Sequence, residues 1–350
     1  MNIYIFILLS FIFLRVIVGE SKTSRINKEK IYLYGGGTIL FFIHAFKNPY
    51  SFLDTPSYAE AYQYICSYGL NSFLEASDFI LKSEIGYAVL MWIVSFISEN
   101  VQTIFIITSF IIVGGYLYSI KKYSAMPWLS LLIFLLTQYY MSMFVLRQFI
   151  AMAICFVLLD YVVERKFLKF FFGVLIAFSM HQTAIIFFPL YFLYPIPINK
   201  KFFLYMFLFI AGLIVIANSI YSYVGVLLVG YESYLDNSSG GTNFKGALLL
   251  IMIFIFYVFL EYRDIQKAGY DKLFFIALCL GLAISIAGTG LVATSRLNLY
   301  YSGLLYLIIP NFLSKVKSPQ LRFCLSNAIC LFFLYFFIRD LPKDYLFFWE

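Results

Sequence analysis

The sequence has little charge and only two histidines. Charged residues make up 12% of the 350 residues, whereas a soluble domain has roughly 25%. Hydrophobic residues reach 63% and the mean hydropathy is +0.88, far above the roughly 45 to 50% apolar content of soluble proteins. This composition excludes an ordinary soluble enzyme and indicates an integral membrane protein.

Signatures of metal and nucleotide sites are also missing. The five cysteines are scattered, mostly within apolar runs, and form neither a CxxC pair nor a group with histidine, so a zinc site is not expected. No DxD-like pattern is present. The glycine run at residues 35–37 follows no strand and lacks the Lys-Ser/Thr of a phosphate loop, and close helix packing explains it better. We expect no metal and no cofactor.

The net charge of +7 would suggest a nucleic-acid partner in a soluble protein. Here most basic residues fall in short clusters between apolar runs, as in the cytoplasmic loops of membrane proteins. The clusters lie at residues 22–30, 121–122, 165–169, 200–201, 263–272 and 315–322. We place all six in the cytoplasm and expect no nucleic-acid partner.

This placement predicts an all-α polytopic protein, a single integral membrane domain over residues 1–350 with about 12 transmembrane helices. The first apolar run lacks the basic start of a cleaved signal, so it counts as a helix. The other predicted spans are residues 31–46, 101–119, 126–145, 148–164, 167–180, 182–198, 201–221, 246–262, 271–290, 297–313 and 321–338. Residues 85–98 are only 14 long, which predicts a re-entrant or interfacial segment.

Two polar stretches, residues 47–84 and 222–245, then face outward, on the periplasmic side. Both could be lids over a site, or they could be connectors between helices.

Isolated polar residues gather at the same outer side. A guanidinium at the bilayer centre costs roughly 2.5 to 3.5 kcal/mol, so ionisable residues in such chains are functional candidates. Five of them are predicted at outer helix ends or in the outer loop: Asp54, Glu84, Arg147, His181 and Arg296. Each also has a structural explanation, because arginines snorkel, carboxylates cap helices and a lone histidine can serve packing. The other histidine, His44, has no polar neighbour in the sequence.

Short motifs around these residues resemble the EpsG family. The motifs are Asp54-Thr55-x-x-Tyr58, Glu84-x-Gly86-Tyr87, Arg147-Gln148-x-x-Ala151, Ala177-x-x-x-His181-x-x-Ala184 and Ser295-Arg296-x-x-x-Tyr300. The resemblance runs from about residue 30 to 313 and is most specific between Arg147 and His181. It departs at Gln182 and Thr183, where a small or basic residue and then Ser are expected, and this leaves the role of the histidine open.

EpsG proteins are similar to Wzy O-antigen polymerases, so the resemblance implies a glycosyltransferase. It would polymerise undecaprenyl-diphosphate-linked oligosaccharides at the outer face of a bacterial inner membrane, without a metal. The implied roles are catalysis by His181, Asp54 and Glu84, diphosphate binding by Arg147, Arg296 and Gln148, and sugar binding by Tyr58, Tyr87 and Tyr300. Besides this substrate and the lipid bilayer, the implied partners are a chain-length regulator and a flippase of the same pathway.

Other functions remain open. A flippase or transporter for the same lipid-linked sugar would have a similar helix count, but it should show internal repeats and polar residues near the midplane, and neither is seen. A membrane O-acyltransferase would share a key histidine but usually has a second polar residue near it, and His181 is followed by uncharged Gln182 and Thr183. Ligase-like glycosyl transfer is a further alternative.

Overall fold

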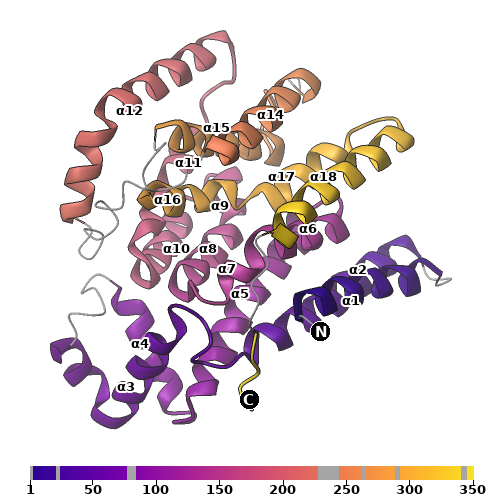
Figure 1. Cartoon of the computed structure of the whole chain (residues 1–350). Helices are drawn as coiled ribbons and strands as arrows, with labels where there is room; N and C mark the ends of the chain where they lie inside the picture. The colour runs from indigo at the N-terminus through magenta and orange to yellow at the C-terminus, as the bar shows by residue number, and fades with distance from the viewer. Residues whose placement is uncertain are drawn as a thin grey trace. The chain divides into compact units, whose positions relative to one another are not determined.

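The computed structural model describes residues 3–20, 24–76, 84–227, 244–261, 265–287, 292–339 and 345–350. These residues form helices, the turns between them and one isolated β-bridge between Lys47 and Phe347 (Figure 1). The prediction of an all-α protein is therefore confirmed. The chain divides into two compact units, Met1–Val157 with Ile309–Glu350 and Leu158–Ile308, each with its own core.

The first unit is built around the helix α5. Its helical segments are α1 (Ile3–Glu20), α2 (Arg25–Ala45), α3 (Thr55–Ala76), α4 (Ile85–Ser95), α5 (Val101–Tyr123), α6 (Pro127–Phe134), the π-helical turn η1 (Leu135–Tyr139), α7 (Tyr140–Ser142), α8 (Leu146–Val157) and α18 (Pro319–Arg339). Helix α5 packs against α2, α3, α4, α6 and α8. Half of the residues in the apolar stretch of α5 are buried.

Small residues allow these helices to approach closely. A Cβ on Gly115 of α5 would lie 2.8 Å from the Cβ of Ala153 in α8. A Cβ on Gly37 of α2 would overlap the side chain of Leu117 in α5, and one on Gly36 would lie 2.8 Å from a Leu131 methyl group. At Gly115 a side chain would press directly on Ala153, and at Gly36 and Gly37 the facing leucine side chains would have to move, so small residues suit these crossings. The prediction that the glycine run serves close helix packing is confirmed.

The helices of this unit place their basic ends together. The side chain of Gln102, at the start of α5, donates to the carbonyl of Ala45 at the end of α2, so these two helices are antiparallel. The C-terminal residues pair with the chain just after α2, since the amide of Asn48 donates to Leu346 at 2.8 Å. The basic first turns of α2 and the basic last turn of α5 therefore share one end, as the positive-inside rule predicts. The first turns of α18 line a cavity with Tyr32 of α2 and Met126, next to α6, at this same end.

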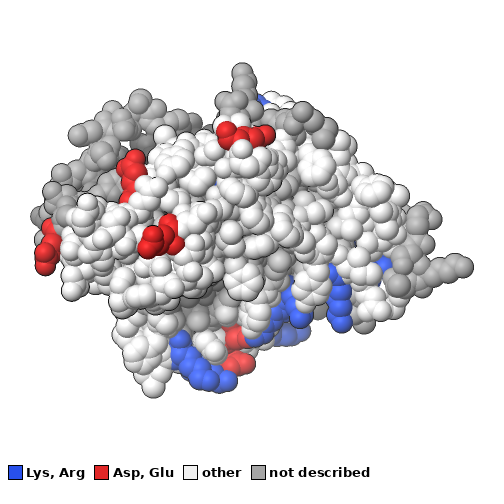
Figure 2. Space-filling model, turned by 90° about the horizontal axis from the view of Figure 1, so that it is seen from below, with Lys and Arg blue, Asp and Glu red and all other residues white. Residues whose placement is uncertain are grey.

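Length and exposure agree with a membrane setting. Three described helices, α5, α15 (Tyr270–Ala287) and α18, are long and apolar enough to cross a membrane, and six shorter apolar helices accompany them. The total of about 12 spans stays a prediction. Large apolar side chains face outward on α1 and α18, where Phe13 is 67% and Phe323 is 70% exposed. Most of the described surface visible in Figure 2 is uncharged. Such faces suit lipid rather than water.

Several predicted spans are broken rather than continuous. Residues 126–145 fold as α6, η1 and α7, and the hydroxyl of Thr137 donates to the carbonyl of Ile133 at 2.7 Å inside this stretch. Residues 148–164 divide at Leu158 into α8 and α9 (Leu159–Val163). Interrupted helices are tolerated at membrane depth where protein surrounds the freed backbone groups, and they are common at functional sites.

The second unit is built around α15, and 72% of the apolar stretch of this helix is buried. Its other helical segments are α9, α10 (Phe167–Met180), the 3₁₀ segment η2 (Gln182–Phe187), α11 (Phe188–Leu193), α12 (Lys200–Leu227), α14 (Phe244–Glu261), α16 (Val292–Ser302) and the start of α17 (Leu305–Ser314). Helices α11, α12, α14 and α16 pack against α15. The 3₁₀ segment η2 is held between α10 and α16.

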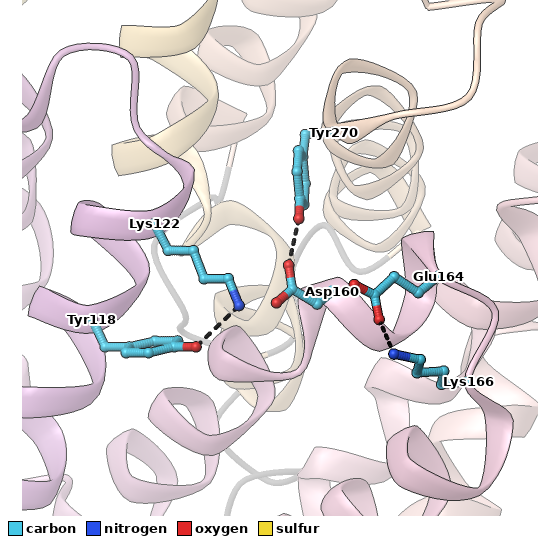
Figure 3. A network of polar contacts seen from close by, with 6 residues as sticks. All are labelled: Tyr118, Lys122, Asp160, Glu164, Lys166 and Tyr270. Carbon is cyan, nitrogen blue, oxygen red and sulfur yellow. Dashed lines mark hydrogen bonds and ion pairs between the residues drawn. The ribbon is translucent and has the colours of Figure 1, made fainter.

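Polar contacts fix the reversal between α9 and α10 in this unit. The hydroxyl of Tyr270 donates to the carboxylate of Asp160, and Lys166 forms an ion pair with Glu164 at 2.6 Å (Figure 3). Between the last two, Arg165 adopts a positive φ of 57°, which is unusual for a residue with a side chain. Its guanidinium donates to a backbone carbonyl of α11. The basic turn is thus tied to its neighbours rather than free.

The two stretches predicted as outward loops differ. Residues 47–84 contain α3, a helix interrupted at Gly69, whose φ of 81° is accessible to glycine. Residues 55–76 of this stretch are therefore helical rather than irregular, because Tyr58, Tyr62 and Ile65 recur at helical spacing and are buried. Residues 77–83 lie outside the described residues. Residues 222–245 belong to the ends of α12 and α14 or lie outside the described residues.

Candidate functional site

An ion pair joins two of the predicted site residues in the first unit. Arg147 is the second residue of α8, directly after the turn that ends α7. Glu84 precedes α4, and its carboxylate accepts a hydrogen bond from the Nη1 of Arg147. The Glu84 side chain has no exposed surface, whereas that of Arg147 is 20% exposed. The Glu84 carboxylate therefore holds the guanidinium from the protein side, while part of the Arg147 side chain stays exposed.

Two tyrosines complete this cluster. The Cζ of Arg147 lies 5.6 Å from the centre of the Tyr58 ring, and the rings of Tyr58 and Tyr87 meet edge to face with centres 5.5 Å apart. Both tyrosines are buried. The Nε of Arg147 and the hydroxyl of Tyr87 are buried, and neither has a hydrogen-bond partner among the described residues. Such unsatisfied groups are rare in native interiors and mark candidate sites.

The capping explanations for the two carboxylates are not observed. Glu84 makes no side-chain cap of α4, because its carboxylate turns to Arg147. At the start of α3 the hydroxyl of Thr55 accepts from the amide of Phe52 at 3.2 Å and closes the turn. Within the part of the chain that the structure describes, the half-buried Asp54 carboxylate accepts no hydrogen bond. Gln148, next to Arg147, is buried.

The remaining candidates lie in the second unit. His181 ends α10 in extended backbone, with its amide donating to Ala177 at 2.9 Å, and its side chain is only 5% exposed. The adjacent η2 meets α16, where the hydroxyl of Thr183 donates to that of Tyr300 at 3.3 Å. Arg296 lies one turn before Tyr300 on α16 and is half-buried. The structure thus groups His181, Thr183 and Tyr300 on elements in contact, with Arg296 on one of them.

A buried lysine and histidine were missed. Lys47 has no exposed surface, and its Nζ donates to the carbonyl of His44 at 2.8 Å. The ring of His44 contacts the hydroxyl of Ser109 at 2.6 Å and the carbonyl of Ser142 at 3.0 Å. His44 therefore has polar partners in the fold, although none is evident next to it in the sequence. Burial lowers the pKa of Lys47 to about 7. Lys47 contacts a residue three positions earlier, but the partners of His44 are 65 and 98 positions away, so no local pattern could reveal them.

Within the described residues, no three His, Cys, Asp or Glu side chains converge as they would around a metal ion. Among the charged groups of these clusters, Lys47 and Glu84 have no exposed surface, whereas the Arg147 side chain is 20% exposed.

Comparison with known proteins gives one match. No curated protein and no solved structure matches the chain. The model of the EpsG family matches residues 30–349, nearly the whole length. This range includes every motif on which the resemblance rests. The chain belongs to the EpsG family.

Proposed function

We propose that this protein is a membrane glycosyltransferase that joins oligosaccharide repeat units carried on undecaprenyl diphosphate. Its active groups face the outer side of a bacterial inner membrane. Membership of the EpsG family supports a polysaccharide polymerase-like activity, and the apolar helices support a membrane location. The product would be O-antigen, capsule or exopolysaccharide.

The Arg147–Glu84 pair is the observation that carries the proposal. A lipid-linked oligosaccharide leaves its diphosphate behind when the glycan is transferred, and negative charge grows on the departing phosphate oxygens. A guanidinium held in place offers planar donors to those oxygens, through charge-assisted hydrogen bonds about twice as strong as neutral ones. Glu84 supplies the fixed position, and the exposed fifth of Arg147 is the part that meets substrate.

The ion pair also assigns different roles to the two carboxylates. In the reaction, the bond between the anomeric carbon and the phosphate oxygen breaks, and the acceptor hydroxyl attacks that carbon while losing its proton. Glu84, buried and paired, acts on the position of Arg147 rather than on this proton. Asp54, half-buried and without a hydrogen bond among the described residues, is a better placed base. His181 is the other candidate, with general-base catalysis worth roughly 10² to 10⁴-fold.

The buried tyrosines act in the proposal as supports. Because Tyr58 and Tyr87 are buried, they pack against the guanidinium and each other rather than against a sugar. Tyr300 is likewise buried and bonded to Thr183.

Deletion of the gene tests the function. Polysaccharide extracted from the cell surface is separated by size, and loss of a polymerase leaves chains of one repeat unit. Loss of a transporter would instead leave no surface chains, and a normal ladder would exclude both. Complementation with Asp54→Asn and with His181→Gln then identifies the base. A variant that restores the ladder has not lost the base, so the base is the residue whose replacement abolishes the ladder.

A further inference from the structure

A cavity of about 650 Å³ opens among α1, α2, α6 and α18 of the first unit. This volume lies within the roughly 300 to 1,000 Å³ of typical ligand sites. Leucines form much of its wall, including Leu8, Leu132, Leu136 and Leu334. The described residues around it include none of the residues assigned to glycosyl transfer above.

Two arginines give the cavity a positive end. The Cζ of Arg15 lies 4.8 Å from the centre of the Trp128 ring, and the Nη1 of Arg322 donates to the carbonyl of Ser314 at 3.3 Å. These contacts orient each guanidinium but use few of its five donors. No Asp or Glu is among the described residues that line the cavity, and neither arginine forms an ion pair there. Arg15 is exposed and Arg322 is half-buried. Two cations at one end of an apolar cavity, with no carboxylate lining it, attract an anionic group.

The rim shows the route by which the occupant enters. Ile12 is 61%, Val16 57% and Phe323 70% exposed, so the mouth is bordered by apolar side chains. A small soluble anion would have to leave water to cross this rim. A lipid of the surrounding bilayer would reach it directly from the side.

The positions of the two arginines along their helices suit headgroup depth. Arg15 is five residues before the end of α1 and Arg322 three residues after the start of α18, about 8 Å and about 5 Å along the helix axes. Both ends belong to the basic end of this unit, which the positive-inside rule assigns to the cytoplasm. Basic pockets between helices on this side suit anionic headgroups.

We propose that this cavity binds one anionic phospholipid of the cytoplasmic leaflet. Its phosphate lies between Arg15 and Arg322, and an acyl chain follows the leucine wall toward Leu8 and Leu136. Tyr32 and Asn327, which also line the cavity, offer polar groups to the headgroup. The site is independent of the glycosyl-transfer chemistry and concerns the opposite end of the first unit.

Lipid binding to the purified full-length protein tests the proposal. Delipidated protein in neutral detergent is titrated with phosphatidylglycerol, with phosphatidylcholine of the same acyl chains and with glycerol phosphate, and bound species are counted by native mass spectrometry. Phosphatidylglycerol should bind roughly tenfold or more tightly than phosphatidylcholine, since each basic residue near a headgroup contributes about 1 kcal/mol. Equal binding of both lipids would overturn the proposal. Equal binding of glycerol phosphate would show a soluble anion site instead.

Variants locate the binding. Arg15→Gln combined with Arg322→Gln should abolish the preference for phosphatidylglycerol. Arg339→Gln is the matched control, because Arg339 also stacks on an aromatic ring, 4.8 Å from Phe336, but at the other end of α18. A double variant that keeps the preference would contradict the assignment.

A second measurement does not depend on the stability of that variant. With Trp92 and Trp349 replaced by Phe, the fluorescence of Trp128 reports on the cavity alone, since the chain has three tryptophans. Phosphatidylglycerol with brominated acyl chains should quench it more strongly than brominated phosphatidylcholine at equal concentration. Equal quenching would overturn the proposal.

Discussion

The guanidinium of Arg147 donates a hydrogen bond to the carboxylate of Glu84, a residue 63 positions earlier in the chain. The contact links the start of α8 to the start of α4 and encloses a carboxylate with no exposed surface. Removal of either charge leaves the other in a poorly solvated place. The pair is thus a structural tie as well as a candidate substrate contact.

The ion pair predicts strong coupling between its two residues. Glu84→Gln should destabilise the protein, because loss of one partner of a buried pair typically costs about 3 to 5 kcal/mol, with the lower value suited to the partly exposed Arg147. Glu84→Gln combined with Arg147→Met should recover part of this loss. Thermal unfolding in detergent is measured for the wild-type protein, for Glu84→Gln, for Arg147→Met and for the double variant. Purely additive effects would mean that the residues do not interact.

The contact between α5 and α8 predicts opposite results for two adjacent glycines. Gly115→Ala places its Cβ 2.8 Å from that of Ala153 and should cost about 1 to 3 kcal/mol through overpacking. Gly114→Ala meets nothing within 4 Å and should be neutral or stabilising, because alanine favours the helix. The unfolding temperatures of the two variants decide the comparison, and equal values would contradict the packing.

Burial of Lys47 predicts that stability depends on pH. Its pKa is about 7 in the folded protein and near 10.5 when exposed, so between these values the unfolded chain binds more protons. The free energy of unfolding in detergent should therefore rise from pH 7 toward pH 10 because of the titration of Lys47. Lys47→Met should flatten the rise, whereas Lys267→Met, at an exposed position, should not. An unchanged pH profile in Lys47→Met would argue against the burial of the Lys47 amino group.

The topology predicts different labelling at two positions. In a variant without its five cysteines, a cysteine at Asn71 should react with a membrane-impermeant reagent in intact cells whose outer layer is permeable. One at Lys267 should react only after lysis. Both positions are exposed in the structure, so access rather than burial decides the result. The reverse pattern would invert the assignment of inside and outside.

Much of the helical framework could be predicted from apolar runs and basic clusters, because chain segments in lipid must satisfy their backbone groups internally. Helix breaks were harder to predict. Leu158, where α8 gives way to α9, is an ordinary apolar residue, and its neighbourhood decides the break. Helix α3 was expected as a loop because polar residues interrupt its apolar ones.

The candidate site was predictable in part. Arg147 and Glu84 stand out as charges beside apolar runs, but their pairing depends on the packing of α4 and α8 around α5. Lys47 is the first residue of the predicted outer loop, residues 47–84, and the sequence does not mark it as buried. Its burial arises from contacts with α5 and with the C-terminal residues, which no local pattern reveals.

The polymer ladder made by Arg147 variants tests the central claim most directly. Each variant is expressed in the deletion strain at wild-type abundance in the membrane, and surface polysaccharide is sized; Arg339→Lys serves as the control and should give a normal ladder. Arg147→Ala should leave single repeat units, and Arg147→Lys should be severely impaired, because lysine keeps the charge but not the planar fork that binds phosphate. A full-length ladder from Arg147→Ala would contradict the account and leave this arginine with a structural role alone.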